Sequence, residues 1–220
     1  MSGDRERILG RIRERLGRGA DDAEARAAIE ARLAAHAPVL IPARARGDDP
    51  VGLFVAMAEA VDTTIARVEA MAAVPEAVAD YLAAHNLPTR GARAPALDAL
   101  PWDRAPLLDL RPGPASADDA LSVTGAFAAI AETGTLMLVS GPDHPTTLNF
   151  LADVHVAVLA KGRIVGAYED GFALLRRERA DLPRTVNFVT GPSRTADIAQ
   201  TLQLGAHGPR RLHVVLVDGA

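Results

Sequence analysis

The chain has 220 residues, a formal net charge of −4 and 24% charged residues, which is typical of a soluble globular protein with one main core. This charge and an aromatic content of only 4% argue against nucleic-acid binding and against stacking platforms for bases. Cysteine is absent, which excludes disulfides, thiol nucleophiles and iron–sulfur clusters ligated by this chain. The first residues lack an apolar signal core and no apolar run could span a bilayer, so we expect a cytoplasmic protein without a membrane span.

Two amphipathic helices are expected near the start of the chain, over residues 4–17 and 22–36. The first places Ile8, Ile12 and Leu16 on one face, with arginine and glutamate side chains elsewhere. Apolar stripes this narrow are typical of helices that pack on a larger body or on a partner protein.

A linker is expected between these helices and the rest of the chain. The run from Pro38 to Pro50 contains proline, glycine and two aspartates, a composition typical of loops. We therefore divide the chain into an N-terminal helical extension with its linker, residues 1–47, and an α/β domain, residues 48–220.

Helices and strands alternate along the predicted α/β domain. Helices are expected after the Asp49 cap, from Pro75 to about His85, and over 148–151 and 170–177; strands are expected over 63–68, 107–110, 121–130, 135–139, 154–159, 185–189 and 212–217. This alternation predicts an α/β fold with an open sheet covered on both faces. Ligands of such sheets bind at the carboxyl ends of the strands.

The turn Glu132-Thr133-Gly134-Thr135, between two of these strands, is the first candidate site. Its glycine allows a positive φ angle or a close backbone approach to a ligand. Glu132 is a candidate catalytic residue, as a general base or a nucleophilic carboxylate, and Thr133, Gly134 and Thr135 are candidate ligand-binding residues. The alternative is an ordinary hairpin turn with a solvated glutamate.

The segment between the last two predicted strands is the second candidate site. A short helix is expected there with Ser193 or Thr195 as its cap, and the first backbone N–H groups of this helix, together with Arg194, would attract an anion. His207 lies on a glycine-flanked turn, which suits proton transfer or binding. The candidate ligand-binding residues here are Gly191, Ser193, Arg194, Thr195, Asp197 and Gly208. The alternative is a capped helix that only connects two strands of a parallel sheet.

Structural roles are predicted for three other histidines. His155 and His213 lie inside apolar strands and are expected to be hydrogen-bonded residues of the core. His144 beside Asp143 is best explained as a loop histidine, since no spaced set of further ligands accompanies it. We therefore expect no metal site.

Two long motifs resemble the lactate utilisation protein C (LutC) family, the LUD domain. They are Thr124-Gly125-Ala126 with 128–135, and Gly191-Pro192-Ser193-Arg194-Thr195-Ala196-Asp197-Ile198 with the following Gly205 and His207-Gly208-Pro209. The opening helix, with Arg7-Ile8-Leu9, is similar too. The resemblance implies a Rossmann-like open sheet similar to the NagB/RpiA/CoA-transferase group.

The resemblance also implies a function. It is a role in oxidising L-lactate to pyruvate beside partner subunits that carry iron–sulfur clusters, with no cofactor in this chain and a small anionic ligand at the strand-end crevice. Whether the chain forms a homo-oligomer is left open at this point. One alternative is a stand-alone enzyme resembling CoA transferases or 5-formyltetrahydrofolate cyclo-ligases, with Glu132 as its reactive carboxylate. Another is an assembly protein whose N-terminal helices dock the iron–sulfur partners.

The two candidate sites are predicted to meet. Both turns follow strands, and the ligand sites of open sheets gather at one edge. We therefore expect Glu132 to face the same crevice as Arg194 and His207.

Overall fold

The computed structural model describes residues 2–17, 19, 22–35, 40–195, 203–205 and 207–219. They form two compact units, Met1–Leu40 and Ile41–Ala220. Every helix in the described ranges is too short or too polar to cross a membrane.

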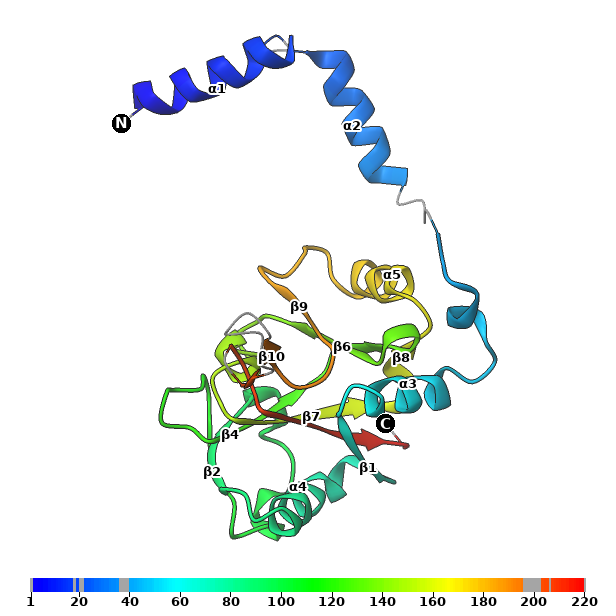
Figure 1. The fold of residues 1–220 in the computed structure, drawn as a ribbon, viewed down its shortest axis with the longest axis vertical. Coiled ribbons are helices and arrows are strands. Elements are labelled where there is room, and N and C mark those ends of the chain that lie inside the picture. Colours follow the sequence, from blue (N-terminus) through cyan, green and yellow to red (C-terminus); the bar gives the residue numbers. More distant parts are fainter. Residues whose placement is uncertain are drawn as a thin grey trace. The chain divides into compact units, whose positions relative to one another are not determined.

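The first unit contains two helices, α1 (Ser2–Leu16) and α2 (Ala23–Ala35), drawn in blue in Figure 1. Both were expected from the sequence to within two residues at each end. Ile8, Ile12 and Leu16 are all exposed, as are Ile29 and Leu33 on the second helix. The predicted stripe therefore exists as an apolar face that the described part of the chain leaves exposed to solvent.

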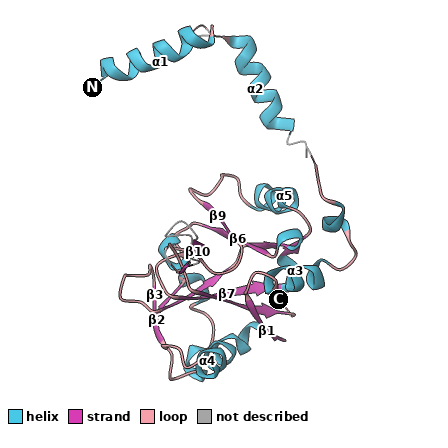
Figure 2. Cartoon of the chain, in the orientation of Figure 1, coloured by secondary structure: helices cyan, strands magenta, loops and turns pink. Residues whose placement is uncertain are grey.

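A six-stranded parallel sheet forms the centre of the second unit (Figure 2). Its strands, in spatial order, are β1 (Thr64–Val68), β12 (Arg211–Val217), β7 (Val154–Ala160), β4 (Leu121–Gly125), β2 (Arg90–Arg93) and β3 (Asp109–Pro112). Every neighbouring pair is parallel. The central strands β12, β7 and β4 are buried along nearly their whole length, because both faces of the sheet are covered.

A smaller sheet packs beside the first. Its strands, in spatial order, are β8 (Ile164–Val165), β5 (Ala128–Ile130), β6 (Thr135–Val139) and β9 (Val186–Val189). The single strand expected over 121–130 is therefore two strands in two sheets. The chain leaves the large sheet at Ala126, whose N–H donates to the Val158 carbonyl. A third pairing joins β10 (Arg194–Thr195) to β11 (Gln203–Leu204).

The helices of this unit are α3 (Pro50–Glu59), α4 (Val74–Ala84) and α5 (Tyr168–Glu178). Short 3₁₀ helices occur at η1 (Ala43–Arg46), η2 (Met71–Ala73), η3 (Pro95–Leu97), η4 (Trp102–Arg104), η5 (Ala131–Thr133), η6 (Thr146–Asn149) and η7 (Lys161–Arg163). The predicted Asp49 cap of α3 is confirmed, since its carboxylate accepts a hydrogen bond from Gly52 N–H at 2.8 Å. Pro50 occupies the first helical position, where its missing N–H costs nothing.

Three buried apolar clusters separate the layers of the second unit. The first lies between the large sheet and α4, and includes Val78, Leu82 and Val156. The second lies between the two sheets and α3, and includes Phe54 and Leu159. A third joins the small sheet to α5 (Figure 1). The α/β class and the open sheet are confirmed, but a second sheet, and not helices alone, covers one face of the large sheet.

The two strand histidines are core residues, as expected. His155 is fully buried, and its Nε2 lies 2.7 Å from the Thr124 hydroxyl. His213 lies 2.8 Å, through Nδ1, from the Thr64 hydroxyl and stacks on Tyr81 with ring centroids 3.8 Å apart. Burial disfavours the charged imidazolium and lowers the pKa of each histidine to about 4.

Candidate functional site

A cavity of about 400 Å³ lies between the end of β9 and the start of β12. We call it the Arg194 cavity. Its walls combine one arginine, one histidine and several hydroxyl and amide groups with apolar side chains, namely Val61, Asn149, Phe150, Phe188, Val189, Thr190, Gly191, Pro192, Ser193, Arg194, His207, Gly208 and Pro209. A mixed wall of this kind suits a small polar ligand with an apolar portion.

Backbone contacts bring the two wall segments together. Ser193 N–H donates to the Pro209 carbonyl at 2.8 Å, and Gly205 N–H donates to the Ser193 carbonyl at 3.0 Å. Gly191 has a φ of +76°, and a Cβ there would overlap the Val61 carbonyl oxygen. Only glycine meets both conditions, so the turn after β9 can approach the end of α3 closely.

Arg194 is the cationic group of this cavity. Its guanidinium forms an ion pair with the Asp62 carboxylate, and its side chain is 35% exposed. Asp62 lies in the left-handed region at φ +62°, a conformation that aspartate and asparagine tolerate better than most residues. A guanidinium has five N–H donors, so a single carboxylate partner leaves donors available to an anionic ligand.

The Glu132 turn adjoins this cavity through a network of hydroxyl groups. The Thr135 hydroxyl lies 2.7 Å from that of Thr133 and 2.6 Å from that of Thr190, which lines the Arg194 cavity. The Tyr168 hydroxyl lies 3.2 Å from both Thr133 and Thr135. The first candidate site is therefore joined to the second by one hydrogen bond.

Glu132 itself points elsewhere. It is 5% exposed, and its Oε1 accepts a hydrogen bond from Tyr168 N–H at 3.3 Å. Tyr168 is the first residue of α5, and a carboxylate near the start of a helix satisfies a free N–H group and offsets the helix dipole. In this arrangement the Glu132 carboxylate stabilises the start of α5. The carboxylate that contacts Arg194 is that of Asp62.

The structure gathers five of the predicted residues, Gly191, Ser193, Arg194, His207 and Gly208, around one cavity. Thr133 and Thr135 lie one hydrogen bond away from it. Asp197 lies outside the described residues, and Thr195 is described only by its place in β10. The roles predicted for these residues stay predictions.

Two expectations about this region are wrong. Ser193 does not cap a helix, because the next two residues form a strand that pairs with β11. The proposed helix body, 196–202, lies outside the described residues. The cavity also does not lie at the carboxyl edge of the large sheet. Its walls come from the turn after β9, in the small sheet, and from the approach to the amino end of β12.

Several residues of the Arg194 cavity were missed. Asp62, the partner of Arg194, follows the last turn of α3 and lies 132 residues away in sequence. Asn149, 7% exposed, and Thr190 are also close to the ligand space. A polar residue directly after a buried strand was the available signal for Thr190, whereas the contact with Asp62 depends on tertiary structure. Among the described residues, no group of three His, Asp or Glu side chains converges to hold a metal ion.

The family comparison agrees with the fold. Residues 51–217 match the LUD domain family. A crystal structure of a DUF162 family protein from Deinococcus radiodurans superposes with a TM-score of 0.54 at 24% identity, covering 77% of this chain and 97% of that one. The likeness to that structure concerns the fold alone.

Curated relatives align over part of the chain. An uncharacterised protein of Neisseria meningitidis is 37% identical over 94 residues, which is 43% of this chain and 40% of that protein. Lactate utilization protein C of Anoxybacillus flavithermus is 33% identical over 99 residues, 44% of each chain. The protein of the same name from Bacillus subtilis is 31% identical over 101 residues, 44% of this chain and 42% of its own. The alignments thus span less than half of each relative.

Proposed function

The chain belongs to the LUD domain family, and from this premise we propose that it serves lactate utilisation by binding a small carboxylate in the Arg194 cavity. The observation that carries the proposal is the placement of Ser193, Arg194 and His207, all from the family-like motif, around one cavity. The names of the relatives from Anoxybacillus flavithermus and Bacillus subtilis support lactate as the substrate class.

The chemistry of the cavity suits a 2-hydroxy or 2-oxo acid. A guanidinium binds a carboxylate through two parallel hydrogen bonds, and the hydroxyls of Ser193 and Thr190 can donate to the second oxygen function. Phe150 and Phe188 provide an apolar wall for a methyl group. The cavity volume of about 400 Å³ exceeds the size of lactate, so a larger acid or several waters would also fit.

In this proposal the redox centres of the system lie in other subunits. This chain has no cysteine, so iron–sulfur clusters would be ligated by partner proteins. The exposed stripe Ile8, Ile12 and Leu16 of α1 supports docking of such partners, or of a second copy of this chain. In this proposal the chain binds the acid, and the iron–sulfur clusters of the partner subunits accept the two electrons that lactate loses, with two protons, when it becomes pyruvate.

A stand-alone enzyme with Glu132 as its reactive carboxylate is the second candidate. Burial of Glu132 beside the hydroxyl network favours it, since carboxylates are seldom fully buried without a specific role. It requires that α5 release the carboxylate from Tyr168 N–H. Turnover of a thioester or a folate by the purified chain alone would favour this second candidate over the first.

Arg194→Ala is expected to weaken binding of L-lactate or pyruvate by roughly ten- to a hundredfold, because it removes a charge-assisted contact. Asp62→Asn should have the opposite effect and tighten binding roughly three- to tenfold, because it removes the carboxylate that competes with the ligand for the Arg194 guanidinium. Asparagine also tolerates the positive φ of this position, so the backbone should stay in place. Isothermal titration of the purified chain measures both changes.

The matched control for this titration is Arg90→Ala, which removes an arginine that is 79% exposed and outside the cavity. Its affinity for both acids should equal that of the wild type. Binding of neither acid to the wild-type chain, or equal binding by the wild type and Arg194→Ala, would exclude the Arg194 cavity as the lactate site.

A further inference from the structure

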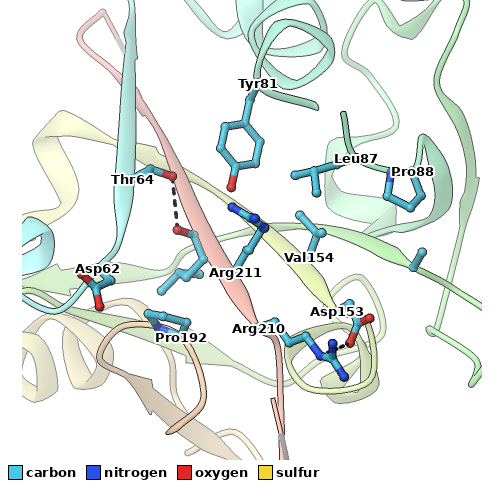
Figure 3. Close-up of a pocket in the computed structure, with 12 residues that line it drawn as sticks. Asp62, Thr64, Tyr81, Leu87, Pro88, Asp153, Val154, Pro192, Arg210 and Arg211 are labelled. Atoms are coloured by element: carbon cyan, nitrogen blue, oxygen red, sulfur yellow. Dashed lines mark hydrogen bonds and ion pairs between the residues drawn. The ribbon is translucent and has the colours of Figure 1, made fainter. Parts of the chain in front are cut away.

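A second cavity, of about 530 Å³, lies at the amino ends of the central parallel strands (Figure 3). We call it the Arg211 cavity. Residues at or next to the starts of four strands line it, from β1, β12, β7 and β4, and α4 contributes Tyr81. Its full lining is Asp62, Thr64, Tyr81, Leu87, Pro88, Ala120, Asp153, Val154, Pro192, Arg210, Arg211 and Leu212. Pro192 borders both cavities.

The charges of this cavity leave one cation without a counter-charge. Asp62 is paired with Arg194, and Asp153 lies 3.4 Å from Arg210. Arg211 forms no ion pair or side-chain hydrogen bond with any described residue. Figure 3 shows its side chain extending into the cavity toward the Tyr81 hydroxyl. An arginine directed into a hollow, with its neighbouring carboxylates already paired, attracts an anion.

Tyr81 is held in place as a second donor. Tyr81 is 7% exposed, and its ring stacks on His213, whose Nδ1 lies 2.8 Å from the Thr64 hydroxyl. The Tyr81 hydroxyl has no hydrogen-bond partner among the described residues, and Figure 3 shows it facing Arg211. A rigid ring with a free hydroxyl next to a guanidinium forms a pair of donors that needs little reorganisation to bind an oxyanion.

Part of the remaining wall of the cavity is apolar. Leu87, Pro88 and Val154 line the side next to the Arg211 guanidinium (Figure 3). Leu212 and Ala120 also line the cavity. A fully hydrated ion would leave these walls in contact with water. The cavity therefore combines anion-binding groups with an apolar wall beside them.

We propose that the Arg211 cavity binds an organic oxyanion, a carboxylate or a phosphate monoester, that carries a short apolar chain. Arg211 and Tyr81 donate hydrogen bonds to the oxyanion, and the apolar chain lies against Leu87, Pro88 and Val154. This site is separate from the Arg194 cavity, and the proposal does not depend on a role in lactate utilisation.

The test is isothermal titration of the full chain with hexanoate, hexyl phosphate, acetate and inorganic phosphate. We expect hexanoate to bind more tightly than acetate, or hexyl phosphate to bind more tightly than inorganic phosphate. Whichever six-carbon probe binds more tightly shows whether the site prefers a carboxylate or a phosphate. Arg211→Gln should weaken that probe roughly ten- to a hundredfold, and Tyr81→Phe, which keeps the stack on His213, roughly three- to tenfold.

Two control variants test whether the probe binds in this cavity and not elsewhere on the chain. Arg90→Gln, at an exposed position outside both cavities, and Ser193→Ala, in the other cavity and without contact to Asp62, should both bind the probe like the wild type. Thermal melting of each variant verifies that it is folded. The proposal is overturned if no probe binds to the wild type, or if Arg211→Gln binds the six-carbon probe as tightly as the wild type does. It is also overturned if the six-carbon probes bind no more tightly than acetate and inorganic phosphate.

Discussion

Gly134→Ala is expected to lower the free energy of unfolding by about 2–5 kcal/mol. Gly134 has a φ of +65°, and a Cβ at this position would overlap the backbone nitrogen of Ala58 in α3. Alanine would be strained in this left-handed conformation, and the overlap falls on backbone, which cannot rotate away. Either the turn or α3 must move.

Thermal melting measures this effect, and the expected fall in melting temperature is roughly 5–15 °C. Gly141→Ala is the matched control, because its added Cβ meets no atom within 4 Å and its φ is not positive. Its melting temperature should stay within about 2–3 °C of the wild type. A Gly134→Ala protein as stable as the Gly141→Ala protein would show that the turn does not pack on α3 as described.

The second large effect is a loss of stability in acid. The pKa of His155 and of His213 is about 4 in the folded chain and ordinarily 6.5, so the unfolded chain binds more protons between these values. The free energy of unfolding therefore falls as the pH drops from 6.5 toward 4, by roughly 3 kcal/mol for each histidine. Above pH 6.5 this contribution is complete and no longer changes.

Chemical denaturation between pH 4 and pH 7.5 measures this slope. His155→Gln and His213→Asn place an amide near the nitrogen that each histidine uses toward Thr124 or Thr64, without a titrating group. Each variant should lose part of the pH dependence, and the double variant should lose most of it. Other acid-sensitive groups are common to all these proteins, so an unchanged slope in the double variant would contradict the low histidine pKa values.

Buried central strands were predictable from sequence. The strand over 135–139 begins and ends as expected, and those over 154–159 and 212–217 agree to within one residue. These strands are apolar on both faces because they lie between covered layers, and such runs are visible in a sequence. Short or polar strands carry no comparable pattern, so β2, β8, β10 and β11 were missed.

The partition into two sheets was not predictable. The apolar run over 121–130 continues through the point where the chain leaves one sheet for the other, because both halves are buried. Residues 185–189 likewise give the same pattern in an antiparallel pair as in a parallel one. Sheet membership depends on hydrogen-bond partners that lie far away in sequence.

The candidate site was predictable in composition and only partly in geometry. The motif containing Ser193 and Arg194 does line a cavity with His207, because the two segments meet through backbone hydrogen bonds near the start of β12. Glu132 was expected beside Arg194, but its carboxylate accepts a hydrogen bond from the first N–H of α5, and Arg194 forms an ion pair with Asp62. Side-chain partners of this kind are decided by packing and leave no local signal.

Growth on L-lactate tests the central claim most directly. Cells that lack this chain should fail to grow with L-lactate as the carbon source and grow normally on pyruvate. The wild-type chain should restore growth on lactate, and Arg194→Ala, made to the same protein level, should not. Normal growth on lactate without this chain, or full restoration by Arg194→Ala, would contradict the account.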